Sequence, residues 1–178
     1  MTDYTFEQYL DYDRSNLLKS EFLRGDIKAM PGGTLRHGVL TTQIGTLLAN
    51  GAGHRGCIIT SPDVRFYIPL CQLSAYPDMM MLCSRPEFYE GKKDVVLNPT
   101  VVAEVLSPST ERYDRDVKFP CYVTVPSVST VLLVGQENQA IQVYRRATNW
   151  QEENYTTGTF KVEGCTIALE AVYRNTDF

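Results

Sequence analysis

Two acidic residues interrupt or border runs of apolar residues. Glu104 lies inside the β-branched run TVVAEVL at 100–106, and Asp78 follows a proline at the start of the run MMMLC. In a strand with alternating side chains, Glu104 would share one face with Val102 and Leu106. Burial of an ionised carboxylate is costly unless a cation or strong hydrogen-bond donors compensate it. Both positions therefore call for a partner.

One suitable partner is a divalent metal ion. Mg²⁺ takes oxygen ligands and is often held by one or two carboxylates together with water and substrate phosphate, so Asp78 and Glu104 could share one ion. Each acid also has a simpler interpretation. Glu104 could form a structural ion pair with an arginine or lysine, and Asp78 could cap a turn, as is common for a Pro-Asp pair.

A lysine follows the two acids in the chain. Asp114 precedes Lys118 by four residues, so a helix would place both on one face, where they would form a surface salt bridge. Alternatively, the ammonium reaches into the site, where it can orient a water nucleophile and offset charge on a phosphate. Pro120 affects this choice because a proline inside a helix costs roughly 3 kcal/mol outside the first turn or a kink. A helix that starts near Val117 would tolerate it.

Other polar residues have weaker claims on chemistry. His37 and His54 are the only histidines, and His37 is interpreted as a helix cap in preference to a phosphate contact. Asp63 is either a third acid near the site or a turn residue. Ser107 and Ser109 have no histidine partner at a recognisable spacing, which disfavours serine nucleophile chemistry.

The elements that must position these residues follow an α/β pattern. A capping box, Thr5 to Gln8, starts a short helix, and Pro31 to Gly33 closes the strand or hairpin that follows. The segment 100–106 is apolar on both faces, which is typical of a buried central strand. Helices are further expected at 35–50 and 111–125, and a strand or hairpin at 20–30. Strands are expected at 76–83 and at 57–69, where Ser61–Asp63 marks a break or an edge feature. Hairpins are expected at 128–145 and around 156–159.

Length and composition predict one domain spanning residues 1–178. The chain has 43% hydrophobic and 21% charged residues, enough for a sizeable core. The first fifteen residues lack the basic start and apolar run of a signal peptide. No apolar run approaches the roughly 18 residues that a membrane span requires. We therefore expect a cytoplasmic protein that does not bind membranes.

The cysteines and the net charge indicate further properties of the protein. The five cysteines, at 57, 71, 83, 121 and 165, never form a CxxC pair, so we expect buried reduced thiols, with no disulfides and no zinc site. The net charge of −4 differs from that of proteins that coat nucleic acid. Any DNA-binding basic surface must be local.

Longer segments of the sequence resemble a known family. PD at 77–78, VVAEVLSPST at 101–110 and RYDRDVKFPCY at 112–122 closely resemble the Uma-type family of restriction-endonuclease-like proteins, in the PD-(D/E)xK nuclease superfamily. The segments EFLRGDIKAMPGG, RHGVL and VLLVGQENQAIQVYRR extend the resemblance over nearly the whole chain. It implies an α/β fold with a mixed central sheet flanked by helices, and a metal-dependent nuclease site.

The resemblance also implies roles for individual residues. Asp78 and Glu104 would fill the two acidic motif positions as metal ligands, and Glu21 would be an auxiliary ligand or support the metal from behind. The superfamily's usual lysine position, two residues after the second acid, is Leu106 here. Lys118, supplied by the next helix, looks like the migrated lysine that this family shows instead.

The implied function is hydrolysis of DNA phosphodiester bonds with Mg²⁺, for which Mn²⁺ would substitute. One alternative is a catalytically silent nuclease fold that binds DNA or a protein partner, with the acids serving as buried ion pairs. Another is a nuclease whose substrate is RNA or branched DNA. By analogy with the superfamily we expect a homodimer, for which the hairpin 128–145 would supply the interface.

Overall fold

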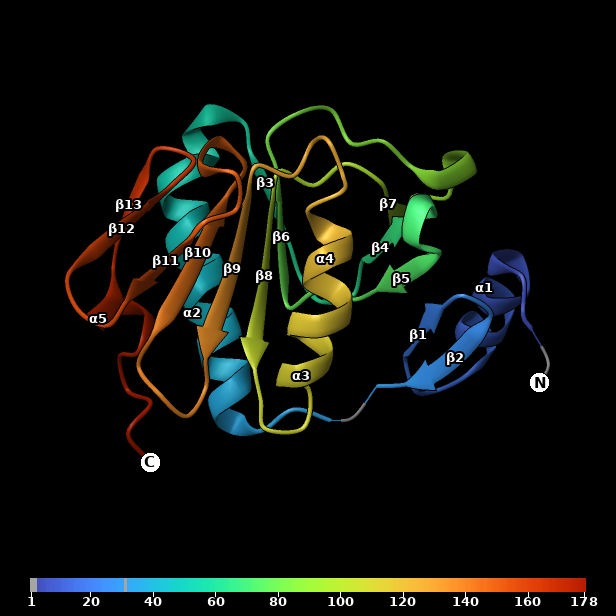
Figure 1. Cartoon of the computed structure of the whole chain (residues 1–178), viewed down its shortest axis with the longest axis horizontal. Coiled ribbons are helices and arrows are strands. Elements are labelled where there is room, and N and C mark those ends of the chain that lie inside the picture. The colour runs from blue at the N-terminus through green and yellow to red at the C-terminus, as the bar shows by residue number, and fades with distance from the viewer. Residues whose placement is uncertain (1–2, 31) are drawn as a thin grey trace.

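The computed structural model describes residues 3–30 and 32–178, and it contains two mixed β-sheets, a small antiparallel sheet and helices (Figure 1). The α-helices are α1 (Phe6–Ser15), α2 (Leu35–Ala52), α3 (Glu111–Tyr113), α4 (Phe119–Tyr122) and α5 (Leu169–Val172). A π-helical turn, Asp114–Lys118, joins α3 to α4, and short 3-10 turns span Gly53–Arg55, Pro69–Cys71, Tyr89–Gly91 and Arg146–Thr148. The predicted mixed α/β fold is confirmed.

The larger sheet has six strands in the order β11-β10-β9-β8-β6-β3. They are β3 (Ile58–Thr60), β6 (Met79–Leu82), β8 (Val101–Leu106), β9 (Thr130–Gly135), β10 (Ile141–Arg145) and β11 (Glu152–Tyr155). Only β8 and β9 run parallel. Helix α2 covers one face, while α3 and α4 cover the other (Figure 1). This sheet carries most of the core.

The central strand β8 is buried along its whole length, as its apolar sequence predicted. Val101, Ala103 and Val105 join the core cluster that includes α2, whereas Val102 and Leu106 join the cluster on the opposite face. The alternation predicted for this strand is therefore confirmed. Glu104 lies on the face that α3 and α4 cover.

The smaller sheet has five strands in the order β2-β1-β5-β4-β7 and holds the N-terminal part of the chain. They are β1 (Ser20–Leu23), β2 (Asp26–Ala29), β4 (Arg65–Ile68), β5 (Leu73–Ala75) and β7 (Val95–Val96). The predicted capping box starts α1, whose Phe6, Tyr9 and Leu10 are buried against this sheet. The chain passes from β5 directly into β6, so the two sheets are linked next to Asp78.

The helix that carries Lys118 begins at Glu111 and accommodates Pro120 through the π turn. The N–H of Phe119 donates to the carbonyl of Asp114, one residue further back than in an α-helix. Pro120 then lies in the first turn of α4, the part of a helix that tolerates proline best. A new helix start near Val117 is therefore not needed.

Two strand predictions were wrong in detail. The segment 57–69 divides at Ser61–Asp63 into β3 and β4, which belong to different sheets. The hairpin expected around 156–159 does not form. Instead β11 pairs with β10, and β12 (Thr159–Val162) pairs with β13 (Cys165–Ala168) in a separate sheet. In both cases the chain turns where the sequence indicated. Pairing with strands more distant in the sequence, however, determines which sheet each strand joins.

The hairpin 128–145 is less accessible than expected. Its two strands, β9 and β10, each have a partner on both sides and are mostly buried. Only the connecting turn is exposed, so the strands themselves are not free to form an interface with a second copy.

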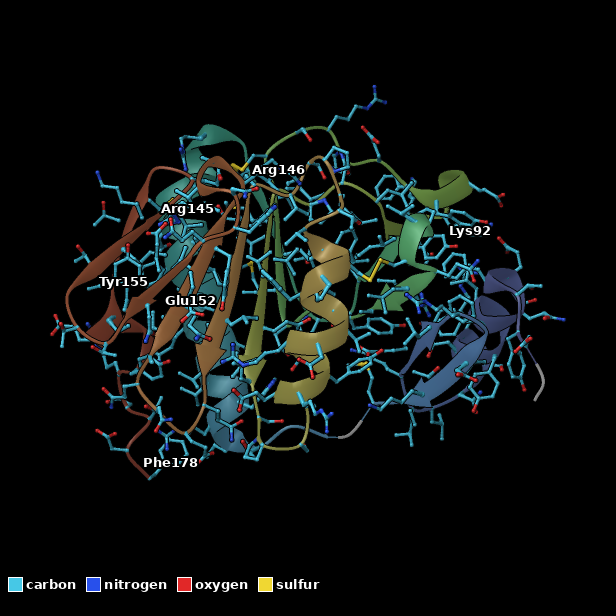
Figure 2. The ribbon with its side chains drawn as sticks, in the orientation of Figure 1. Lys92, Arg145, Arg146, Glu152, Tyr155 and Phe178 are labelled. Carbon is cyan, nitrogen blue, oxygen red and sulfur yellow. A yellow bond between two sulfur atoms is a disulfide. The ribbon has the colours of Figure 1, made fainter. Side chains whose placement is uncertain are left out.

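The expectation of five reduced cysteines was also wrong. Cys57 is bonded to Cys83 and Cys71 to Cys121, while Cys165 is a buried free thiol (Figure 2). Sequence spacing concealed the first pair because it depends on strand register. Ile58 pairs with Leu82, so the preceding and following cysteines lie opposite each other, with Cα atoms 4.2 Å apart.

No helix within 3–30 or 32–178 is long and apolar enough to cross a membrane.

Helix α2 packs closely on β13, and this contact can be tested with two glycines of the same helix. A Cβ at Gly51 would lie 2.7 Å from Cβ and Sγ of Cys165, whereas a Cβ at Gly38 would meet nothing within 4 Å. We expect Gly51→Ala to lower the free energy of unfolding by about 1–3 kcal/mol through overpacking. Gly38→Ala should raise it by up to about 1 kcal/mol.

Urea unfolding monitored by circular dichroism measures both changes. An increase in stability for Gly51→Ala similar to that for Gly38→Ala would contradict the close packing.

Candidate active site

Asp78 and Glu104 lie side by side because of the register between two antiparallel strands. β6 pairs with β8 so that Met79 faces Ala103, and the next pair outward is Asp78 and Glu104. The N–H of Asp78 donates to Glu104 Oε2 at 3.3 Å. Oδ2 of Asp78 accepts from the N–H of Val105 at 2.7 Å. Each acid is thus anchored to the other's strand.

Lys118 reaches this pair from the π turn. Its Nζ lies 2.9 Å from Glu21 Oε1, 3.1 Å from Asp114 Oδ1 and 3.4 Å from Glu104 Oε1. The lysine side chain is only 7% exposed, so its pairing with Asp114 is a buried contact and not the surface salt bridge considered from the sequence. The structure therefore brings together all four residues singled out by the sequence, Glu21, Asp78, Glu104 and Lys118.

Two further side chains complete the cluster. The hydroxyl of Tyr122 donates to Glu104 Oε1 at 2.5 Å, and Nε2 of His37 lies 3.1 Å from Asp78 Oδ2. The interpretation of His37 as a cap was wrong, because Thr34 caps α2 and accepts from the N–H of His37. Tyr122 follows Lys118 by four residues, so helical spacing could have indicated it.

Burial dominates the electrostatics of the cluster. It raises the pKa of Glu104 well above its usual range, the charges of Asp114 and Asp78 add to the rise, and Lys118 opposes it. Burial alone would lower the pKa of Lys118, but Glu104, Glu21 and Asp114 outweigh it and raise that pKa well above normal. The lysine is therefore a charged ammonium among several carboxyl groups.

The hydrogen bond with Asp78 raises the pKa of His37, against the effect of burial. The imidazole of His37 therefore adds a second cationic group next to Asp78 at mildly acidic pH.

The cluster opens into a cavity of about 560 Å³. Asp78, Glu104, Asp114, Lys118 and His37 line it, together with the loop 107–110 and the residues before α2. Glu21 is not among the lining residues, so it supports Lys118 from behind. The C-terminal end of β8 lies near the N-terminal ends of α2 and α3 (Figure 1), and residues at these ends, among them Thr34, Ser107 and Thr110, line the cavity.

The donor set fits a hard divalent cation. Asp78 and Glu104 offer carboxylate oxygens to the cavity, and the cluster holds more carboxyl groups than ammonium groups. No group of three or more His, Cys, Asp or Glu side chains within 3–30 and 32–178 is arranged to enclose a metal ion. Two carboxylates with water and phosphate are a common arrangement for Mg²⁺ and suit Mn²⁺ as well, whereas zinc favours nitrogen and sulfur ligands.

The remaining sequence candidates lie elsewhere or interact with one another. Asp63 is an exposed turn residue that pairs with Lys19 and accepts from Ser61, and it does not line the cavity. Ser107 Oγ lies 3.0 Å from Ser109 Oγ, so these hydroxyls form a local cluster on the rim. The side chain of His54 is outside the described part of the chain.

A second buried network of hydrogen bonds, centred on Asp13, holds the segments that carry Glu21 and Asp78. Asp13 accepts hydrogen bonds from Ser20, Arg65 and Tyr76. Ser20 precedes Glu21 on β1, and Tyr76 lies two residues before Asp78. This carboxylate therefore fixes both segments that bring acids to the cluster.

Comparisons with known proteins show the family and the fold of the chain. A family model described as "Putative restriction endonuclease", that of Uma2, matches residues 6–172. The chain belongs to the Uma2 family. Two proteins from Synechocystis sp. (strain ATCC 27184 / PCC 6803 / Kazusa) are similar to it in sequence. "Uncharacterized protein sll1609" is 32% identical over 83% of each chain, and "Uncharacterized protein slr1290" is 31% identical over 97% of this chain and 92% of its own.

A solved structure shows the same fold. The crystal structure of "a putative nuclease belonging to DUF820" from Anabaena variabilis ATCC 29413 superposes with a TM-score of 0.72, at 16% identity, over 89% of this chain and 91% of its own. At this identity the likeness concerns the fold. The fold expected from the sequence is therefore confirmed. Any reaction has to be argued from the residues of the cluster.

The supporting network predicts a pH-dependent stability. Asp13 is buried, and although burial favours its neutral form, hydrogen bonds from Tyr76, Ser20 and Arg65 lower its pKa. Because the pKa of Asp13 is lower in the folded chain than in the unfolded chain, its ionisation stabilises the fold at pH values above the unfolded pKa of about 3.9. This stabilisation is lost as the pH falls through the folded pKa. We expect Asp13→Asn to lower the free energy of unfolding by about 3–5 kcal/mol at pH 7 and by less below about pH 4.

Urea unfolding at pH 7 and pH 3 tests this, with Asp11→Asn, an exposed position of the same helix, as the control. An equal loss of stability at both pH values would contradict the assigned role of Asp13.

Proposed function

We propose that this Uma2 protein is a metal-dependent endonuclease that hydrolyses DNA phosphodiester bonds, with Mg²⁺ as its cofactor and Mn²⁺ as a substitute. The observation that carries the proposal is the pair of carboxylates from neighbouring strands, Asp78 and Glu104, in one cavity with a buried lysine 3.4 Å from Glu104. The family description supports the reaction class.

The roles follow from the contacts. Asp78 and Glu104 would hold the metal ion, which when bound would polarise the phosphate and lower the pKa of a bound water. Val105 and His37 fix the carboxylate of Asp78, while Tyr122 fixes that of Glu104. These partners hold the acids in position before any ligand arrives.

Lys118 supplies the positive charge from the chain itself. Its ammonium would offset charge that develops on the scissile phosphate and orient the attacking water. Glu21 contacts Lys118 at 2.9 Å from outside the cavity, so we assign it the role of positioning the lysine. It is placed behind the lysine and does not need to contact the metal.

DNA is the proposed substrate although the chain has a net charge of −4. Hydroxyl groups of the loop 107–110 and the N-terminal ends of α2 and α3 border the cavity, and such groups favour phosphate. We also propose a homodimer, since cleavage of both strands of a duplex needs two sites.

A catalytically silent nuclease fold is the second candidate. The three carboxylates around Lys118 form the kind of buried ion-pair cluster that a purely structural role would produce. In that case the protein would bind DNA or a protein partner, and it would bind neither Mg²⁺ nor Mn²⁺ at Asp78 and Glu104.

The first test removes the carboxylate charges. We expect Asp78→Asn and Glu104→Gln each to lower the Mg²⁺-dependent cleavage rate by about 10²–10³-fold or more, with the fold retained. Cleavage is measured on supercoiled, linear, single-stranded and branched DNA, and Mn²⁺ binding is measured separately by calorimetry. Asp63→Asn, an exposed acid outside the cavity, is the control. Full activity in either variant would exclude the assignment, and a wild-type protein without Mn²⁺ binding would favour the silent fold.

The second test separates the lysine from the metal ligands. Lys118→Met should retain Mn²⁺ binding, because a positive charge is removed from beside the carboxylates, but it should cleave DNA at least about tenfold more slowly. Lys118→Arg controls for charge, and thermal unfolding reports whether the buried acids still fold around the substitution. Cleavage by Lys118→Met at the wild-type rate would show that the lysine has a structural role only.

A further inference from the structure

The sheet face that carries Glu104 continues across three more strands. Strand register pairs Glu104 with Leu133, Leu133 with Gln142 and Gln142 with Asn154. Register partners present their side chains on the same face, and neighbouring strands lie about 4.8 Å apart. Two amide side chains therefore stand in the same row as the acid, roughly 10 and 14 Å away along the sheet.

A second cavity, of about 320 Å³, lies over this part of the row. Gln142 and Asn154 line it from the sheet. Pro108 and Gln136 line both this cavity and the one that holds the acids. The two cavities therefore adjoin at these two residues.

The helix that begins at Glu111 separates the two cavities. Asp114 and Lys118 line the acidic cavity, whereas Glu111 and Arg115 line the second. Each pair has the spacing of one helical turn, and Arg115 Nε donates to Glu111 Oε1 at 2.8 Å. One face of the helix thus serves the acids, and the adjacent face serves the amide-lined cavity.

The lining of the second cavity suits an uncharged polar ring better than a phosphate. Its charged side chains are one arginine and two glutamates, Arg115, Glu111 and Glu137, which disfavour an anion. Amide and guanidinium groups offer the paired donors and acceptors that match the edges of nucleobases, and amides pair especially well with adenine.

The amides are partly held in place. Nε2 of Gln142 donates to Glu152 Oε1 at 2.9 Å, and Glu152 extends from β11 (Figure 2). Gln136 is 5% exposed, and its carbonyl oxygen has no hydrogen-bond partner among the described residues. Gln136 therefore places a buried acceptor without a partner in the wall between the two cavities.

We propose that this second cavity binds a nucleobase of the substrate strand close to the scissile phosphate and gives the enzyme a base preference at that position. The position relative to the cleaved bond rests on the proposed function. The binding of a nucleobase does not, because the cavity and its amides are separate from the metal ligands.

The test of base binding uses the full chain without metal. Each of the four 2′-deoxynucleosides, which carry no phosphate, is titrated and followed by saturation-transfer NMR. We expect one of them to bind preferentially, and the double variant Gln142→Ala with Asn154→Ala to bind it about tenfold more weakly. Gln139→Ala, an amide on the nearby β9–β10 turn that does not line the cavity, should bind it unchanged. Binding of none of the nucleosides, or equal binding by the double variant, would overturn the proposal.

Cleavage of an oligonucleotide library with randomised bases separates this inference from the proposed function. Biased bases at the cleaved ends, lost in the double variant while cleavage continues, would support both. Nucleoside binding without any Mg²⁺-dependent cleavage would overturn the function and leave the base site standing. Cleavage with unbiased ends would overturn the base preference and leave the nuclease standing.

Discussion

Glu104 places a carboxylate on the central strand of a sheet whose two faces are both covered, and most of the surrounding polar structure compensates for it. One oxygen accepts from Tyr122 and faces Lys118, and the other accepts from the N–H of Asp78. Without these partners the buried charge would cost more than the strand could offset. The same partners also hold the carboxylate at the wall of a cavity. The contacts that stabilise the buried acid therefore also fix its position in the candidate site.

The helix after β8 illustrates how a local irregularity serves this arrangement. Pro120 would disrupt an unbroken α-helix, and the π turn before it lets the chain continue as a helix. The turn contains both Asp114 and Lys118, which are buried and directed to the acids. Helices that contain a single π turn often carry functional groups, because the extra residue changes the direction of the side chains around it.

The distribution of charge explains how an acidic protein could act on DNA. Negative charge is concentrated in the buried cluster, where a divalent ion would neutralise it, while the surrounding rim presents hydroxyl groups and helix N-termini. The adjoining cavity is polar but offers no net positive charge. The phosphate and the base of one nucleotide would therefore meet surfaces of different chemistry on the two sides of a single helix.

The sequence by itself determined the fold class, the central strand and the identity of the two acids, because acids in apolar runs and alternating burial are local patterns. Spacing also indicated that Asp114 and Lys118 share a helix face. Only the tertiary structure decided that His37 contacts Asp78, that Tyr122 contacts Glu104, that Cys57 meets Cys83 and that no hairpin forms around 156–159. These features depend on strand register and on how a helix packs across a sheet. Both are set by contacts between residues far apart in the chain, on which local residue patterns carry little information.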